Sequence, residues 1–205
     1  MRRFVTHLNL IMKNYLASTE YIDWKEPTVR AKAEALSQGI QAQEHIAKAC
    51  FEYVRDEIKH SNDYQLNPVT CKASDVFKYK TGYCYAKSHL LAALLRANGI
   101  PAGLCYQRLT IDNDQPPFCL HGLNAVYLPE FGWYRVDARG NKEDVDAQFT
   151  PPTERLAYPI ITEGEADFPK IYDEPLKEVV SVLTQTTSYD EVANNPPDMD
   201  INENA

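Results

Sequence analysis

Apolar residues in the first hundred positions recur mainly at helical spacing. Pro27 suits the first turn of a helix that runs to about Gly39, and a longer amphipathic helix is predicted over 41–60. A short helix is expected around residues 75–80. The apolar face of the longest of these helices is formed by Ile46, Ala47, Cys50, Phe51, Val54 and Ile58. The N-terminal part of the chain is therefore predicted to be helical.

A more apolar helix is expected after Thr81-Gly82. Its apolar positions are Ala86, Leu90, Leu91, Ala92, Ala93, Leu94, Leu95 and Ala97. Asn98-Gly99 followed by Pro101 predicts where it ends, because Gly accepts the left-handed cap and Pro cannot continue a helix. Cys84 lies in the predicted first turn, where free N–H groups and the helix dipole favour a thiolate. A small buried cysteine fits this segment equally well.

After Pro101 the pattern becomes that of β-strands. Strands are predicted over 103–109, 118–128 and 132–138, with polar or Pro-containing turns between them. Helices followed by such an antiparallel meander indicate an α+β domain. Pro, Thr, Glu and Asp dominate from Asn141 onward, where one last helix is expected over 174–183.

Composition narrows the function classes. The 205 residues carry a net charge of −8, which argues against nucleic acid and anionic membrane surfaces as partners. No apolar stretch approaches the roughly 18 residues that span a membrane, and no export signal is found. The odd number of cysteines, without C-x-x-C spacing, argues against a disulfide framework or zinc ribbon and favours a cytoplasmic location. They are Cys50, Cys71, Cys84, Cys105 and Cys119, of which Cys50, Cys105 and Cys119 are expected to serve packing.

The last two predicted strands offer a histidine and a carboxylate. A three-residue connection pairs Leu128 with Gly132. That register places His121 opposite Arg139 and makes Asp137 its diagonal neighbour on the same face, within side-chain reach. A two-residue connection without a bulge places His121 and Asp137 on opposite faces.

Together with Cys84, these residues suit nucleophilic catalysis. A thiolate attacks, an imidazole moves the proton, and a carboxylate fixes the imidazole tautomer. Each residue alone also has a structural interpretation, such as a hydrogen-bonded strand histidine or a turn aspartate. A metal site formed by the same three residues is disfavoured because no spacing supplies a fourth ligand, and no cofactor is required.

The ordered motifs resemble the transglutaminase-like family of the papain-like superfamily over about residues 42–140. They are Gly82-Tyr83-Cys84, the helix ending in Gly99-Ile100-Pro101, His121, Trp133-Tyr134-Arg135-Val136-Asp137 and the preceding helix around 51–58. The resemblance implies that Cys84 is the nucleophile, His121 the base and Asp137 the orienting carboxylate. It also implies a central Cys-bearing helix packed on an antiparallel β-sheet, after N-terminal helices. Family members often have His-Ala-Trp where this chain has His121-Gly122-Leu123, so the neighbouring wall of the cleft is expected to differ.

The expected domain organisation follows from these segments. Residues 1–40 form an N-terminal helical extension, 41–140 the transglutaminase-like catalytic core, 141–190 a C-terminal extension packed on it, and 191–205 a disordered tail. The Cys84 N–H is one natural oxyanion donor. A second oxyanion donor is expected from Asn62 or Tyr64. These two residues and Tyr83 are the candidates for contacts with the substrate or the oxyanion.

Acyl transfer through a thioester is thus expected, with hydrolysis of a peptide or amide bond preferred. The substrate is expected to be a peptide, a protein or a small amide. Transfer to an amine, as in a protein-glutamine transglutaminase, and a non-catalytic peptide-binding module stay open as alternatives. The binding module is suggested by tyrosines expected near the site: Tyr79, Tyr83, Tyr85, Tyr106, Tyr127 and Tyr134. The sequence does not indicate an oligomeric state.

Overall fold

The computed structural model describes residues 12–112 and 115–200 of the chain. Its helices are α2 (Pro27–Ser37), α3 (Gln43–Glu57), α4 (Ala73–Tyr79), α5 (Cys84–Ala97), α6 (Lys177–Gln185) and α7 (Tyr189–Asn194). Its strands are β1 (Lys59–His60), β2 (Thr81–Gly82), β3 (Ala102–Asp112), β4 (Gln115–Leu128), β5 (Gly132–Val136) and β6 (Ala166–Asp167). The predicted α+β architecture is confirmed.

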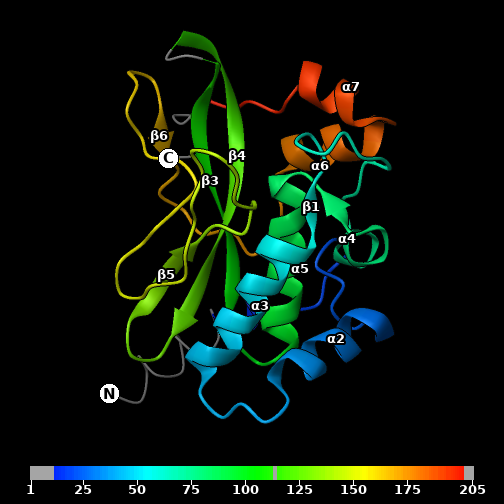
Figure 1. The fold of residues 1–205 in the computed structure, drawn as a ribbon, viewed down its shortest axis with the longest axis vertical. Helices are drawn as coiled ribbons and strands as arrows, with labels where there is room; N and C mark the ends of the chain where they lie inside the picture. The colour runs from blue at the N-terminus through cyan, green and yellow to red at the C-terminus, as the bar shows by residue number, and fades with distance from the viewer. Residues whose placement is uncertain (1–11, 113–114, 201–205) are drawn as a thin grey trace.

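The Cys-bearing helix α5 lies at the centre of the fold. It contacts β3 and β4 on one side and α2, α3 and α4 on the other, so it is enclosed between the sheet and the remaining N-terminal helices (Figure 1). Every residue from Cys84 to Arg96 is buried. A helix that is buried all round needs apolar or small side chains on every face, which explains the Leu- and Ala-rich sequence.

The polar side chains of α5 have partners within the core. Ser88 Oγ donates to the Cys84 carbonyl at 2.8 Å, and a ring nitrogen of His89 lies 2.7 Å from the Cys71 carbonyl. Arg96 donates to three carbonyls, including that of Ala102 at 2.9 Å. These bonds offset the desolvation cost of buried polar groups. The helix ends as predicted, with Gly99 in the left-handed region at φ 72°.

The antiparallel sheet has the strand order β5-β4-β3-β6. Leu128 pairs with Gly132, and the ladder continues to Asn124 and Val136. This is the register predicted from a three-residue connection. Because the side-chain period of a strand is two, the register places His121 and Asp137 on the same face of the sheet.

A two-stranded parallel ladder joins the end of α3 to the start of α5. Lys59 pairs with Thr81, and His60 with Gly82. This ladder was not predicted, because two-residue strands carry no periodic signal. It brings the residues that follow β1 beside Cys84.

The C-terminal segment corrects the expectation of a disordered tail over 191–205. Residues 189–194 form α7, and the Pro197 carbonyl accepts a hydrogen bond from Leu120 N on β4 at 2.8 Å. Arg108 and Asp198 form an ion pair of 2.7 Å. These tertiary contacts give residues 191–200 a defined position that the polar composition does not indicate. Residues 201–205 lie outside the described part of the chain.

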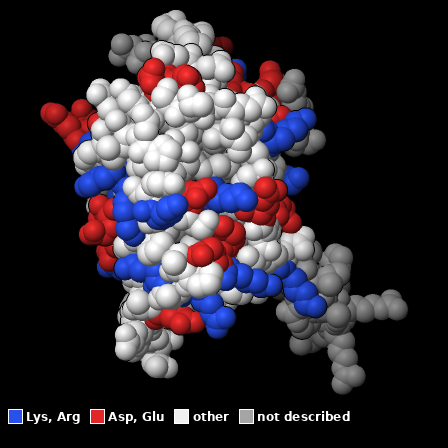
Figure 2. Space-filling view, turned by 90° about the vertical axis from the view of Figure 1, so that its right-hand side faces the viewer, with Lys and Arg blue, Asp and Glu red and all other residues white. Residues whose placement is uncertain are grey.

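Figure 2 shows basic and acidic side chains mixed in bands across the helical face of the molecule, without a broad area of one sign on that face. Mixed charges of this kind are typical of a solvated surface. In the described ranges, no helix combines the length and the hydropathy needed to cross a membrane.

Candidate active site

Cys84 is the first residue of α5, with Tyr83 as the N-cap residue. The first N–H groups of a helix have no acceptor within the helix, so the Cys84 amide is oriented to donate outward. The Gly122 N–H of β4 lies 3.4 Å from the Cys84 sulfur and donates to it. The sulfur thus lies at the N-terminus of α5 and also accepts a hydrogen bond from the neighbouring strand.

His121 and Asp137 form a buried pair. His121 Nε2 lies 2.7 Å from Asp137 Oδ2, and the two side chains are 6% and 0% exposed. The carboxylate also accepts hydrogen bonds from the Arg139 N–H and the Ala157 N–H, both at 3.1 Å. Because Nε2 is used by Asp137, Nδ1 is the ring nitrogen available to Cys84. The carboxylate therefore fixes both the orientation and the tautomer of the imidazole.

Electrostatics favour the charged forms of this pair. Burial lowers the pKa of His121, but the charges of Asp137 and Cys84 and hydrogen bonds to both outweigh it, so the pKa is raised above its ordinary value. Burial raises the pKa of Asp137, but His121 and two backbone N–H groups outweigh it and hold the pKa below its ordinary value. A protonated imidazole beside the ionised carboxylate of Asp137 is thereby stabilised.

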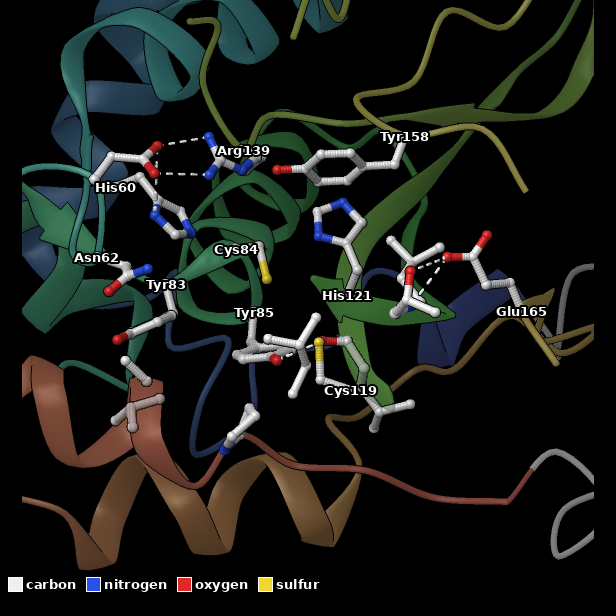
Figure 3. Close-up of a pocket in the computed structure, with 18 of the residues that line it drawn as sticks. His60, Asn62, Tyr83, Cys84, Tyr85, Cys119, His121, Arg139, Tyr158 and Glu165 are labelled. Atoms are coloured by element: carbon white, nitrogen blue, oxygen red, sulfur yellow. Dashed lines mark hydrogen bonds and ion pairs between the residues drawn. The ribbon is translucent and has the colours of Figure 1, made fainter. Parts of the chain in front are cut away.

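Cys84 and His121 open into a cavity of about 500 Å³. Figure 3 shows the Cys84 sulfur between His121 on one side and His60 and Asn62 on the other. Apolar residues make up much of the remaining wall: Tyr83, Tyr85, Leu109, Ile111, Leu120, Tyr158, Ile161, Val192, Ala193 and Pro196. The C-terminal segment therefore contributes directly to the cavity.

A charged pair lies beside His60. Arg139 donates two hydrogen bonds to Asp63, at 2.6 and 2.9 Å. Burial raises the pKa of Asp63, but hydrogen bonds from Arg139 and Lys142 and the charge of Arg139 outweigh it and lower the pKa to about 2. Burial and the positive charge of Arg139 hold the pKa of His60 well below its ordinary value, so His60 faces the cavity as a neutral imidazole.

Sequence reasoning did not find Tyr158, whose ring stands edge-on to His121 at 5.1 Å between centroids. It covers the imidazole and limits its contact with water. The Arg139 guanidinium lies 5.7 Å from the same ring. No local pattern marks Tyr158, because it lies in an irregular segment that reaches the sheet only in the folded chain.

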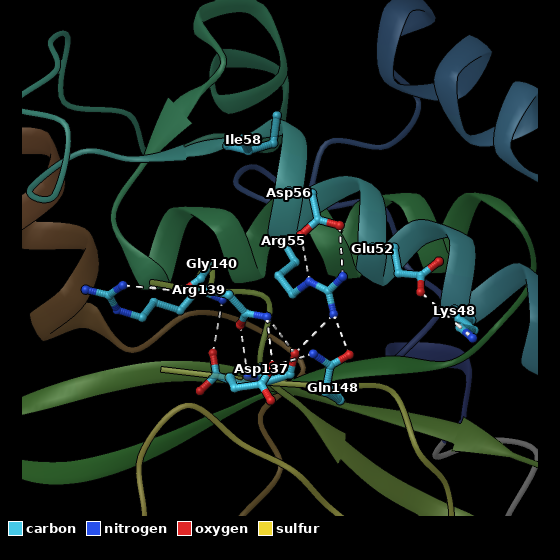
Figure 4. Close-up of polar contacts among 12 residues, drawn as sticks. Lys48, Glu52, Arg55, Asp56, Ile58, Asp137, Arg139, Gly140 and Gln148 are labelled. Carbon is cyan, nitrogen blue, oxygen red and sulfur yellow. Dashed lines mark hydrogen bonds and ion pairs between the residues drawn. The ribbon is translucent and has the colours of Figure 1, made fainter. Parts of the chain in front are cut away.

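Two basic side chains bond around the C-terminal end of α3, one to residues 147–148 and the other from α5. Arg55 donates to the Ala147 carbonyl and to Gln148, both at 3.1 Å (Figure 4). Lys87 donates to the Ile58 carbonyl and, at 3.4 Å, to the Arg55 carbonyl at the end of α3. Burial and Arg139 lower the pKa of Lys87 to about 7. Neither residue was singled out from the sequence.

The predicted contact residues divide into two groups. Asn62 and Tyr83 line the cavity. Tyr64 does not: it is 54% exposed and borders a separate hollow. The ammonium of Lys59 lies 4.8 Å from the centroid of the Tyr64 ring. Tyr64 is therefore not placed to supply an oxyanion donor.

The tyrosines and cysteines also differ from expectation. Of the six tyrosines expected near the site, Tyr83 and Tyr85 border the cavity and the other four are not among the described residues that line it. Cys119, expected to serve packing, lines the cavity as well. Burial raises the pKa of the other three thiols to about 12, which suppresses their thiolate forms; they are Cys50, Cys71 and Cys105.

The arrangement can support nucleophilic attack by sulfur and proton transfer by an imidazole held by a carboxylate. On the other side of the Cys84 sulfur, the cavity also offers the side-chain amide of Asn62 as a hydrogen-bond donor. Within residues 12–112 and 115–200, no group of three or more His, Cys, Asp or Glu side chains is arranged to hold a metal ion.

One family model and several solved structures are similar to this chain. The family model of the transglutaminase-like superfamily matches residues 30–138, just over half of the chain. Among curated proteins, no sequence matches. A proposed cysteine protease from Cytophaga hutchinsonii is similar with 20% identity and a TM-score of 0.48, over 61% of this chain and 40% of its own. The periplasmic domain of TgpA from Pseudomonas aeruginosa is similar with 22% identity and a TM-score of 0.43, over 55% of this chain and 42% of its own. The chain thus spans about two fifths of the length of these proteins.

Proposed function

Because the chain belongs to the transglutaminase-like superfamily, we propose that it is a cysteine-dependent acyl-transfer enzyme that hydrolyses a peptide or amide bond. Cys84 is the nucleophile, His121 the general base and acid, and Asp137 the orienting carboxylate. The observation that carries this proposal is the buried His121–Asp137 pair, with a 2.7 Å hydrogen bond, beside a cysteine at a helix N-terminus.

In the proposed reaction, the Cys84 sulfur attacks the amide carbonyl carbon. The C–S bond forms, and the carbonyl oxygen becomes an oxyanion that the Cys84 N–H and the Asn62 amide stabilise. His121 then donates its proton to the amide nitrogen, the C–N bond breaks, and the amine leaves. Water attacks the thioester, His121 takes its proton, and the carboxylic acid and the thiolate are released.

Two features support hydrolysis and an amide substrate. The cavity of about 500 Å³ has a volume suited to a peptide segment or a small amide. Asn62 lines the polar end of this cavity and is exposed to solvent. Water can therefore reach the thioester from that end. The same triad also supports transfer to an amine, and the products distinguish the two reactions.

The test is a mass-spectrometric screen of a peptide and amine library with the wild type, Cys84→Ala and Cys119→Ala. Cys119→Ala is the matched control, because it removes a second thiol from the same cavity. The wild type and Cys119→Ala should form hydrolysed products, and Cys84→Ala should form none. Asn62→Ala should slow product formation without weakening substrate binding. Products that persist in Cys84→Ala would overturn the mechanism, and amide products with added amines would assign transfer instead.

A further inference from the structure

Two exposed isoleucines lie at one end of the cavity. Ile111 is 39% exposed and Ile161 74%, and both line the cavity that contains Cys84. With the neighbouring Leu109 they form an aliphatic surface, here called the isoleucine rim (Leu109, Ile111 and Ile161). Large apolar side chains that are exposed together at a cavity mouth are typical of a surface that binds an apolar group.

The register of the sheet shows on which side of the site this rim lies. Gln107 of β3 pairs with His121, and Leu109 pairs with Cys119. Leu109 therefore continues along the His121 face, about 7 Å further along the strand at 3.3 Å per residue. Ile111 lies two residues further along β3, at a register shift of the ladder, and lines the same cavity. Figure 3 shows Glu165, which holds this region, on the far side of His121 from Cys84. The rim thus lies beyond the imidazole, not beyond the sulfur.

Glu165 fixes the two parts of the rim relative to each other. One carboxylate oxygen accepts from Thr110 N at 2.9 Å and from Thr110 Oγ1 at 2.8 Å. The other accepts from the backbone N–H groups of Ile161 and Thr162 at 3.1 and 3.0 Å. The turn that carries Ile161 is thereby attached to the strand that carries Ile111. Each of the two carboxylate oxygens already accepts two hydrogen bonds. A ligand at the rim therefore meets aliphatic side chains and not a free carboxylate.

We infer that the isoleucine rim is the subsite for the amine part of the substrate and selects an amine that carries apolar side chains. This inference rests on the proposed function. His121 delivers a proton to the leaving amine, so that amine lies on the His121 side of the sulfur, where the rim begins. The distance along β3 corresponds to the first two to four residues of an extended peptide. The substrate class is therefore a peptide with apolar residues directly after the cleaved bond.

The subsite can be tested without the natural substrate, because an acyl-enzyme can be intercepted by an added amine. In that step the amine nitrogen attacks the thioester carbon, the C–N bond forms and the C–S bond breaks. The amine proton passes to His121, and the Cys84 thiolate is released. This is the reverse of amine departure, so the incoming amine occupies the same subsite as the leaving amine.

The experiment acetylates the full-length protein with p-nitrophenyl acetate and adds Leu-Leu amide, Gly-Gly amide or Lys-Lys amide. Mass spectrometry measures the ratio of acetylated dipeptide to acetate, with Cys84→Ala as the background. The wild type should favour Leu-Leu amide over Gly-Gly amide by about five- to tenfold, as expected for partial burial of leucine side chains.

Variants locate the preference. Ile161→Ser and Ile111→Ser change exposed side chains, so the fold should be retained, and each should reduce the preference to about twofold or less. Ile160→Ser is the matched control. Ile160 is 37% exposed, adjacent in sequence, and borders a different hollow. That variant should keep the full preference.

The possible failures can be told apart. Absence of acetyl on Cys84 would overturn the proposed function and this inference with it. Acetylation of Cys84 without a preference for Leu-Leu amide would overturn the inference alone, as would a preference for Lys-Lys amide. A preference that survives the Ile111→Ser, Ile161→Ser double variant would also overturn it.

Discussion

Gly122 approaches Tyr85 so closely that a Cβ added to Gly122 would lie 2.9 Å from the Tyr85 Cα. Real Cβ atoms essentially never come that near to backbone. The missing side chain lets β4 pass directly against the first turn of α5, where the Gly122 N–H donates to the Cys84 sulfur. This contact accounts for a glycine directly after His121 in this chain.

Gly122→Ala should therefore separate β4 from α5. We expect a loss of about 1–3 kcal/mol in the free energy of unfolding, typical of overpacking, together with slower alkylation of Cys84. Urea unfolding and iodoacetamide labelling measure the two effects. Gly39→Ala is the control, because Gly39 has φ 77° and open space around it. It should lower stability without changing Cys84 alkylation, and an unchanged alkylation rate in Gly122→Ala would contradict the account.

Asp137→Asn should lower the pKa of His121. Without the carboxylate, burial favours the neutral imidazole, so we expect His121 to titrate at least about one pH unit lower than in the wild type. NMR titration of the His121 ring measures this. Asp56→Asn, which removes an exposed carboxylate paired with Arg55, should leave the titration unchanged. The same His121 titration in wild type and Asp137→Asn would show that Asp137 does not hold the proton on the imidazole.

The raised pKa of His121 also predicts how stability depends on pH. Its contribution is fully present below the ordinary value of 6.5 and is lost as the pH rises through the raised folded-state value. In Asp137→Asn this loss should be smaller and should end at lower pH, because the substitution lowers only the folded-state pKa of His121. Urea unfolding of both proteins measures the difference. The free energy of unfolding is compared from about pH 6, just below the ordinary pKa of histidine, to about pH 9. Parallel pH profiles would contradict the prediction.

Lys87 should produce a slope of the opposite sign. Its pKa is lowered from 10.5 to about 7 in the fold, so between these values the unfolded chain binds more protons and stability rises with pH. From about pH 7 to 9, the wild type should gain about 2 kcal/mol relative to Lys87→Met, measured by urea unfolding. A difference that does not change with pH would mean that Lys87 stays charged in the folded protein.

Arg139 and Asp63 should be energetically coupled. Their two short hydrogen bonds join side chains that are 6% and 18% exposed, so solvent screens them less than a surface pair. A double-mutant cycle with Arg139→Met and Asp63→Ala should give a coupling of about 1–2 kcal/mol in the free energy of unfolding. The Arg30–Glu34 pair, 64% and 65% exposed, is the reference and should give about 0.3–0.5 kcal/mol. Equal coupling in both pairs would contradict the account.

The parts of the fold that were predicted are those with a local signal. The ends of α5 follow from Thr81-Gly82 and Asn98-Gly99, and the hairpin register follows from the three residues between Leu128 and Gly132. That register is what brings His121 to Asp137. Local chain geometry therefore predicted, for the three-residue connection, that the two side chains lie within reach of each other.

The parts that were not predicted depend on long-range contacts. Asp63 and Arg139 are 76 residues apart, and neither position is marked by a periodic pattern. The C-terminal segment enters the cavity wall through Val192 and Pro196, although its composition resembles that of a disordered tail. Glu165 joins two segments by side-chain-to-backbone bonds, which a sequence pattern does not encode.

The central claim is that His121, held by Asp137, activates Cys84. Site-resolved alkylation with iodoacetamide near pH 6.5, the ordinary pKa of histidine, tests it most directly when the modified peptides are counted by mass spectrometry. Cys84 should react at least about tenfold faster than each of the other four cysteines, and His121→Ala should abolish this advantage. If Cys84 reacts no faster than Cys119, or if its rate is unchanged in His121→Ala, Cys84 is not an activated nucleophile.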